Sequence, residues 1–233
     1  MSVNRKQRVA ILFAMEQEAR NFIDHYKFID VSNNSALPFK YYRYDEMNTI
    51  ELIVAVNGTC KTHAVDQVGT VPAAVNAFAL IQQFAPDLVI SAGTAGGFKK
   101  FDLRIGEVVL SKGLFWYHDR RISLPNFLEY GLGGIESFST DLFAKNLNLR
   151  QVQISSGDSL ATSKDDFSIL EKTGAKVKEM EATAIAWVCR ELKTPFFAVK
   201  SITDFLDVPE KVAAQFIQNL NMASENLTKV LIQ

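Results

Sequence analysis

Five acidic residues follow segments that have the composition of buried strands, at the points where those segments end. They are Glu16, Glu18, Glu179, Glu181 and Asp204. Ligands of open α/β sheets bind outside the carboxyl ends of the strands, so we expect several of these carboxylates to share one pocket. Such a cluster suits a polyhydroxylated, neutral or cationic ligand and is ill suited to a phosphate. Two of its members could act as a general acid and a general base.

Each motif also has a purely structural interpretation. Glu18 fits the first turn of a helix, where the dipole favours an acid, and Asp204 could cap a local turn. The segment TAGG (94–97) is typical of a glycine-rich turn after a buried strand, and GDS (157–159) of a plain turn. The occurrence of all of them at strand ends favours a functional site.

The remaining reactive residue types give weaker signals. His63 and His118 are isolated, and we expect them in loops or at the surface, like the basic pair Lys99 and Lys100. Cys60 and Cys189 have no histidine at a readable spacing, so packing roles are expected. With no CxxC pair and no cluster of histidine and carboxylate, the sequence predicts neither a metal site nor a cofactor.

Composition restricts the class of protein. The chain has 233 residues, 48% of them hydrophobic and 22% charged, with a formal net charge of -1. These values are typical of a globular protein, and we expect a single domain over residues 1–233. The absence of a basic stripe argues against nucleic acid as a partner. No apolar stretch is long enough for a membrane span, and the N-terminus lacks the pattern of a signal peptide. Two cysteines without a disulfide framework favour the cytoplasm.

Hydrophobic periodicity predicts strands that alternate with helices. Predicted strands are 9–14, 39–44, 49–56, 87–93, 105–111, 152–156, 175–178 and 195–202. Predicted helices begin at Glu16, cover about 70–84 and EMEATAIAWVCREL (179–192), and begin at Asp207. The segment 117–137 is predicted to be an irregular loop. Buried strands that alternate with helices indicate an α/β fold with helices on both faces of the sheet.

Five segments together resemble the 5'-methylthioadenosine/S-adenosylhomocysteine nucleosidases of the purine nucleoside phosphorylase superfamily. They are AMEQE (14–18), SAGTAGGF (91–98), SSGDSL (155–160), KEMEATAIAWV (178–188) and SITD (201–204). The stretches VDQVGTVPA, WYHDRRI and FIQNL are most similar to the plant-type branch. The resemblance implies a three-layer α/β/α sandwich with a central twisted mixed sheet, nucleoside phosphorylase-like. It also implies a cytoplasmic homodimer that acts in methionine salvage and takes a small adenine nucleoside as its partner.

The resemblance also implies roles for individual residues in hydrolysis of the bond between ribose and adenine. Glu18 would activate the attacking water, Asp204 would protonate adenine at N7, and Glu181 would bind the ribose hydroxyls. The remaining residues would line the pocket: Met15 at the 5'-alkylthio group, Met180 against the sugar, Thr94, Ala95 and Gly96 along ribose and purine, Leu160 over the adenine face and the Ala161 backbone at its edge. The family often has an aromatic residue where Leu160 stands, a larger aliphatic one at Ala161 and serine at Thr94.

Three alternatives share this fold. A nucleoside phosphorylase would need cations for phosphate, and Arg20 is the nearby candidate, although Glu16 and Glu18 would repel that anion. A non-catalytic nucleoside-binding or storage protein would be expected to lack the acid pair of Glu18 and Asp204. A hydrolase of another adenosine-like nucleoside, such as a futalosine-type precursor, would use the same leaving-group chemistry. The sequence does not fix whether the 5' pocket admits the homocysteine tail.

Overall fold

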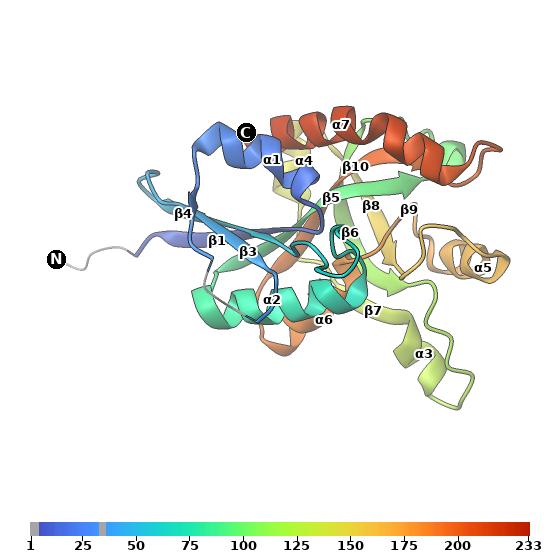
Figure 1. The fold of residues 1–233 in the computed structure, drawn as a ribbon. Helices are drawn as coiled ribbons and strands as arrows, with labels where there is room; N and C mark the ends of the chain where they lie inside the picture. The colour runs from blue at the N-terminus through green and yellow to red at the C-terminus, as the bar shows by residue number, and fades with distance from the viewer. Residues whose placement is uncertain (1–4, 33–35) are drawn as a thin grey trace.

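The computed structural model describes residues 5–32 and 36–233, in which the strands form one ten-stranded mixed sheet (Figure 1). The strands are β1 (Gln7–Phe13), β2 (Ile29–Asp30), β3 (Lys40–Tyr44), β4 (Ile50–Val56), β5 (Leu88–Gly97), β6 (Val108–Tyr117), β7 (Gly133–Glu136), β8 (Arg150–Ser156), β9 (Val177–Glu179) and β10 (Phe196–Phe205). Their order is β10-β6-β8-β9-β5-β1-β4-β3-β2, and β7 pairs with β6. Because β10 also pairs with β5, five strands close into a ring of pairings, from which β1, β4, β3 and β2 extend.

Helices cover both faces of this sheet. They are α1 (Glu16–Tyr26), α2 (Thr70–Phe84), α3 (Phe127–Leu132), α4 (Asp141–Leu147), α5 (Lys164–Thr173), α6 (Ala182–Glu191) and α7 (Val212–Leu231), with a 3₁₀ turn at Lys99–Phe101. Figure 1 shows α1, α4 and α7 on one side of the sheet and α2 and α6 on the other. This confirms the predicted three-layer α/β/α architecture with a mixed sheet.

The central strands contain long apolar runs because both of their faces are covered. Ala10 and Leu12 of β1, with Ile53 of β4, belong to the core under α2 and α6. Ile11 and Phe13 of β1 belong to the core under α1 and α7. Parallel strands buried on both faces have continuous apolar runs for this reason. The run VAILFA therefore ends abruptly where the chain reaches the edge of the sheet and α1 begins.

The segment TAGG is part of strand β5 and does not form the predicted turn. Thr94 and Ala95 pair with Ser201 and Ile202 of β10, and Gly96 pairs with Asp204 after an irregularity in register. Gly96 also pairs with β9 on its other side. Glycine is needed here because a Cβ at Gly96 would lie 2.6 Å from Oδ2 of Asp204. Close approach between strands, rather than a turn, explains this glycine.

Other predicted boundaries were wrong in ways that the tertiary contacts explain. The strand predicted at 105–111 is β6, which begins at Val108 and continues to Tyr117, and the predicted loop at 117–137 contains α3 and β7. The last helix begins at Val212 instead of Asp207. The carboxylate of Asp207 instead accepts hydrogen bonds from the backbone N–H groups of Lys99 and Lys100, at 2.7 and 2.9 Å.

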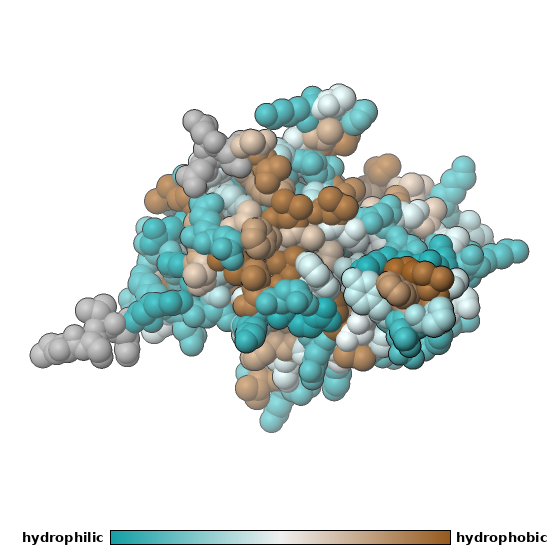
Figure 2. Space-filling view, turned by 90° about the horizontal axis from the view of Figure 1, so that it is seen from below, coloured by the Kyte–Doolittle hydropathy of each residue, from teal (hydrophilic) through white to brown (hydrophobic). Residues whose placement is uncertain are grey.

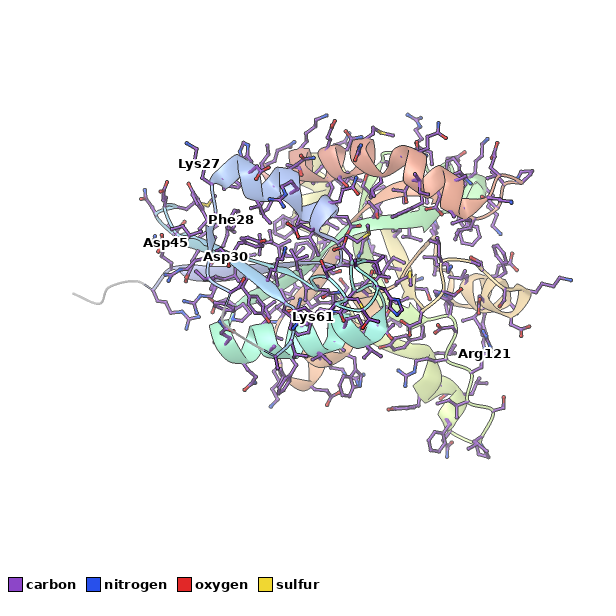
Figure 3. The ribbon with its side chains drawn as sticks, viewed as in Figure 1. Lys27, Phe28, Asp30, Asp45, Lys61 and Arg121 are labelled. Atoms are coloured by element: carbon purple, nitrogen blue, oxygen red, sulfur yellow. The ribbon has the colours of Figure 1, made fainter. Side chains whose placement is uncertain are left out.

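Helices α4 and α5 are absent from the sequence prediction. Helix α5 has a readable signal, because Ser163 and Asp166 form a capping box at its N-terminus. Arg121, labelled in Figure 3, joins this helix to the segment after β6 through an ion pair with Asp166 at 2.5 Å. A single domain over residues 1–233 stays a prediction, and its first four residues lie outside the described part of the chain.

Candidate active site

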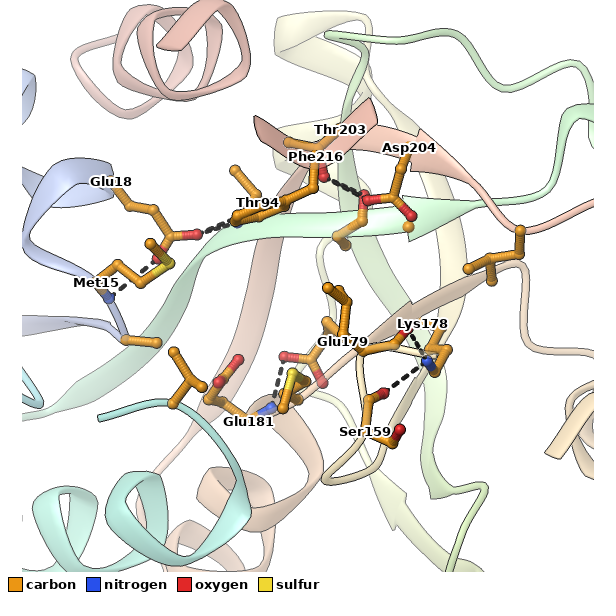
Figure 4. A pocket seen from close by; sticks show the side chains of 17 residues that line it. Met15, Glu18, Thr94, Ser159, Lys178, Glu179, Glu181, Thr203, Asp204 and Phe216 are labelled. Carbon is orange, nitrogen blue, oxygen red and sulfur yellow. Dashed lines mark hydrogen bonds between the residues drawn. The ribbon is translucent and has the colours of Figure 1, made fainter. Parts of the chain in front are cut away.

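A cavity of about 300 Å³ opens where the ends of β1, β5, β9 and β10 meet (Figure 4). Its walls combine buried carboxylates with apolar side chains. The lining residues are Ala14, Met15, Glu18, Val68, Thr94, Ala95, Gly96, Ser159, Leu160, Lys178, Glu179, Met180, Glu181, Thr203, Asp204, Leu206 and Phe216. Mostly apolar walls with a few converging polar groups are typical of a site for a small molecule.

Glu18 lies in the first turn of α1 and is 3% exposed. Its Oε1 accepts hydrogen bonds from the backbone N–H and the hydroxyl of Thr94, at 2.7 and 2.6 Å. Its Oε2 accepts a longer bond of 3.2 Å from the backbone N–H of Met15. Burial raises the pKa of Glu18, and the hydrogen bonds of Thr94 and the charge of Lys200 oppose that rise. The side chain is therefore held in one orientation.

Asp204 lies near the end of β10 and is 2% exposed. The hydroxyl of Thr203 donates a hydrogen bond of 2.8 Å to its Oδ1. Oδ2 faces Gly96 on the neighbouring strand. Burial raises the pKa of Asp204, and the hydrogen bond from Thr203 and the charge of Lys178 oppose that rise. A buried carboxyl with a raised pKa can retain a proton for donation to a ligand.

Glu181 and Glu179 lie at the junction between β9 and α6. Oε1 of Glu181 accepts a hydrogen bond of 2.8 Å from the backbone N–H of Gly69, just before α2. Glu179 accepts bonds from the backbone N–H groups of Glu181 and Ala182, and its Oε2 forms an ion pair of 2.9 Å with Lys200. Burial and the charge of Glu179 raise the pKa of Glu181. This end of the pocket therefore gathers two buried acidic groups beside the buried Lys200.

Two buried lysines near the cavity, Lys178 and Lys200, were not predicted from the sequence. Burial disfavours the charged form of Lys200, but the carboxylates of Glu179, Glu181 and Glu18 outweigh that penalty and raise its pKa. The ammonium of Lys178 donates hydrogen bonds to three backbone carbonyl oxygens, those of Ser159, Leu160 and Ala161. A signal existed for Lys200, since a lysine inside an apolar strand such as FFAVKSI must find a buried partner.

The structure brings nine of the ten predicted site residues into one cavity. The nine are Met15, Glu18, Thr94, Ala95, Gly96, Leu160, Met180, Glu181 and Asp204. Ala161 is outside the lining, and its carbonyl oxygen faces Lys178. Glu16 points elsewhere and pairs with Lys40 and Arg20. The predicted convergence of strand-end carboxylates thus holds for four of the five acids, including Glu179.

His118 lies in the loop after β6, as expected, but it is buried and not at the surface. Its ring is 1% exposed, and Nδ1 lies 3.1 Å from the hydroxyl of Ser155. Burial lowers its pKa to about 4. Cys60 and Cys189 are free thiols, and burial raises the pKa of the Cys189 thiol. His63, Lys99 and Lys100 are exposed, as expected.

Within residues 5–32 and 36–233, no group of three or more histidine, cysteine or acidic side chains is arranged to hold a metal ion. None of the helices described there has the length and apolar character that crossing a membrane would require.

Comparisons with known proteins agree with this geometry. A family model described as the phosphorylase superfamily matches residues 8–233. A 5'-methylthioadenosine nucleosidase of Arabidopsis thaliana is 36% identical over 230 residues, which cover 96% of this chain and 85% of the relative. A 5'-methylthioadenosine/S-adenosylhomocysteine nucleosidase of the same plant is 34% identical, with 96% and 90% covered. The apo structure of the Arabidopsis 5'-methylthioadenosine nucleosidase superposes with a TM-score of 0.94 at 34% identity, covering 98% of this chain and 94% of the other.

Proposed function

Because the chain belongs to the phosphorylase superfamily and, within it, to the plant-type branch of the 5'-methylthioadenosine/S-adenosylhomocysteine nucleosidases, we propose that it hydrolyses 5'-methylthioadenosine to adenine and 5-methylthioribose. The observation that carries the proposal is the placement of two buried carboxyl groups, Glu18 and Asp204, in the wall of one cavity. The reaction is N-glycosidic bond hydrolysis, and its product suits a role in methionine salvage.

Asp204 is the proposed acid for the leaving group. When the bond between C1' and N9 breaks, the electron pair goes to the adenine ring, which leaves readily only if it gains a proton. In our proposal the carboxyl of Asp204 gives its proton to N7. Burial raises the pKa of Asp204, which favours the protonated form that this step needs. Thr203 donates to Oδ1, so that Oδ2 is the oxygen left to carry the proton.

Glu18 and Glu181 are proposed to serve the sugar. Thr94 occupies Oε1 of Glu18, which leaves Oε2 with lone pairs to orient a water molecule and take its proton as the water oxygen bonds to C1'. Glu181 keeps one carboxylate oxygen free of Gly69 for the ribose hydroxyls. In their ionised forms, both carboxylates favour the positive, oxocarbenium-like sugar of the transition state more than the neutral substrate.

The cations near the pocket argue against phosphorolysis. Lys200 is paired with Glu179, and Lys178 donates to three carbonyl oxygens. Arg20, the candidate from the sequence, is exposed, lies outside the lining and pairs with Glu16. Phosphate would therefore meet carboxylates without a free cation in the described lining, and water is the favoured nucleophile.

The deciding experiment measures release of free adenine from 5'-methylthioadenosine in phosphate-free buffer. We expect release by the wild type and its loss in Glu18→Gln and Asp204→Asn. Lys112→Met, at an exposed position outside the cavity, is the control variant and should release adenine like the wild type. Release that requires phosphate would instead identify a phosphorylase. A repeat with S-adenosylhomocysteine measures whether the pocket accepts the longer 5' tail.

We further propose that the protein forms a homodimer through the face that α2 and α6 share. Figure 2 shows brown side chains across the lower face of the molecule. Exposed apolar residues there include Val71, Val75 and Phe78 of α2 and Trp187 of α6. Apolar patches of this kind are typical of subunit interfaces. Val68, which lines the cavity, immediately precedes α2, so a second subunit on this face would lie beside the 5' end of the ligand.

A cytoplasmic location is part of the proposal and is supported by the two free cysteines, Cys60 and Cys189. Fractionation of cells that express the tagged protein tests it.

A further inference from the structure

Lys178 is a buried cation held without a carboxylate partner. It lies in β9, is 4% exposed and lines the cavity. Its Nζ lies 2.7, 2.8 and 3.1 Å from the carbonyl oxygens of Ser159, Leu160 and Ala161 (Figure 4 shows the Ser159 side). An ammonium has three N–H donors, so all of them are used. Among the described residues Lys178 forms no ion pair, unlike Lys200.

The three carbonyl groups belong to a segment that has little else to hold it. Residues 159–161 connect β8 to α5, have no regular secondary structure and have exposed side chains. On one side Asp158 is fixed by a bond of 2.6 Å from its N–H to Asp119, and on the other Ser163 caps α5. Between these anchors, in the described part of the chain, the hydrogen bonds to the backbone of 159–161 all come from Lys178.

Residues 159–161 form the part of the cavity wall that would contact the purine base. Leu160 and Ser159 line the cavity next to Lys178 and Asp204. Leu160 is 42% exposed and is an aliphatic side chain, so it covers a flat base only if the backbone holds it in place. A carbonyl oxygen has two lone pairs, so the bond from Lys178 leaves the Ala161 oxygen able to accept a second donor.

We propose that Lys178 is a positioning residue, whose ammonium holds the segment 159–161 in the conformation that receives the purine base. The proposal rests on the proposed function, in which Leu160 and the Ala161 backbone contact adenine. Lys178 acts through this segment, because its three hydrogens are donated to the three carbonyl oxygens.

The consequence is a change in binding rather than in chemistry. Without the ammonium, only a fraction of the molecules holds residues 159–161 in the conformation that receives the base, and the apparent affinity falls by that fraction. The charge of Lys178 acts to lower the pKa of Asp204, so its removal favours the protonated form of the acid. Substrate and base should therefore bind more weakly while the chemical step continues.

The test compares Lys178→Met with Lys176→Met. Lys176 is exposed two residues earlier in the chain and bonds none of the three carbonyls. For K178M we expect KM for 5'-methylthioadenosine and the inhibition constant of adenine to rise together by about tenfold, with kcat within about twofold. For K176M we expect both constants to match the wild type. Equal constants in the two variants, or a lower kcat at unchanged KM, would overturn the proposal.

Limited proteolysis by subtilisin, with the cut located by mass spectrometry, gives a readout that needs no activity. Cleavage within 158–163 should be about tenfold faster in K178M than in K176M. An inactive wild type would refute the proposed function, whereas equal cleavage of the two variants would refute the role of Lys178. If K178M does not fold, Lys178→Arg keeps the cation and its donors. Subtilisin should cleave K178R at a rate within about threefold of the wild type. Tenfold faster cleavage of K178R than of the wild type would count against the positioning role of Lys178.

Discussion

Replacing Lys200 with methionine removes the ammonium that neutralises the buried carboxylates beside the pocket. Lys200 is 2% exposed and lies 2.9 Å from Oε2 of Glu179, which is equally inaccessible. Its charge also lowers the pKa values of Glu18 and Glu181. Methionine has a similar length and fills the same space, so the variant isolates the loss of charge.

The expected loss of stability is large because an unpaired charge remains in the interior. Removal of one partner from a buried ion pair costs about 3–5 kcal/mol. For a chain of 233 residues that corresponds to a fall in Tm of roughly 6–20 °C.

The loss should grow with pH. Without Lys200, the pKa values of Glu18 and Glu181 in the folded state rise further above those of the unfolded chain. A carboxyl group whose folded pKa is raised contributes stability below its unfolded pKa, and that contribution is lost as the pH rises through the folded pKa. The difference in Tm between wild type and K200M should therefore be smallest near pH 5 and largest near pH 9.

Thermal unfolding followed by circular dichroism at pH 5, 7 and 9 measures this difference. Lys112→Met is the control, since the ion pair of Lys112 with Asp141 is exposed and worth about 1 kcal/mol or less. The double variant K200M/E179Q should regain part of the lost Tm, because glutamine retains an acceptor for the N–H groups of α6 without the charge. A K200M protein as stable as K112M, or a deficit that does not change with pH, would refute the reasoning.

Four further results are expected. Glu18→Gln should lower kcat by about 10²–10⁴-fold in the adenine-release assay, and a variant within tenfold of the wild type would remove Glu18 from the mechanism. Gly96→Ala should lower kcat while circular dichroism stays unchanged, because the new Cβ would lie 2.6 Å from Oδ2 of Asp204 and displace the acid; full activity would contradict that contact. Burial raises the pKa of Asp204, so kcat/KM should fall as the pH rises through that pKa, whereas a profile that stays flat to pH 10 would argue against an acid role. Phe78→Glu should convert the proposed dimer to a monomer in light scattering, and equal masses of wild type and variant would contradict this interface.

Local sequence patterns predicted an α/β fold with helices on both faces of the sheet and the acids of the lining, whereas the mixed sheet and the other lining residues were implied by the family resemblance. The apolar runs VAILF in β1 and FFAV in β10 require cover on both faces, which leads to helices on both sides of a sheet. The acids that follow such runs must lie at the edge of that sheet, which is why Glu18, Glu181 and Asp204 were predicted together. These inferences need only the periodicity of each segment and the order of segments along the chain.

The pairing of β5 with β10 and the closure of the ring of strands were decided by tertiary contacts. TAGG is extended because β10 and β9 lie against it, with Gly96 adjoining Asp204, and no local signal separates this strand from a turn. The partners of Lys178 and Lys200 depend on strand register in the same way. Register fixes which side chains meet across neighbouring strands, whereas periodicity fixes only the face to which each one points.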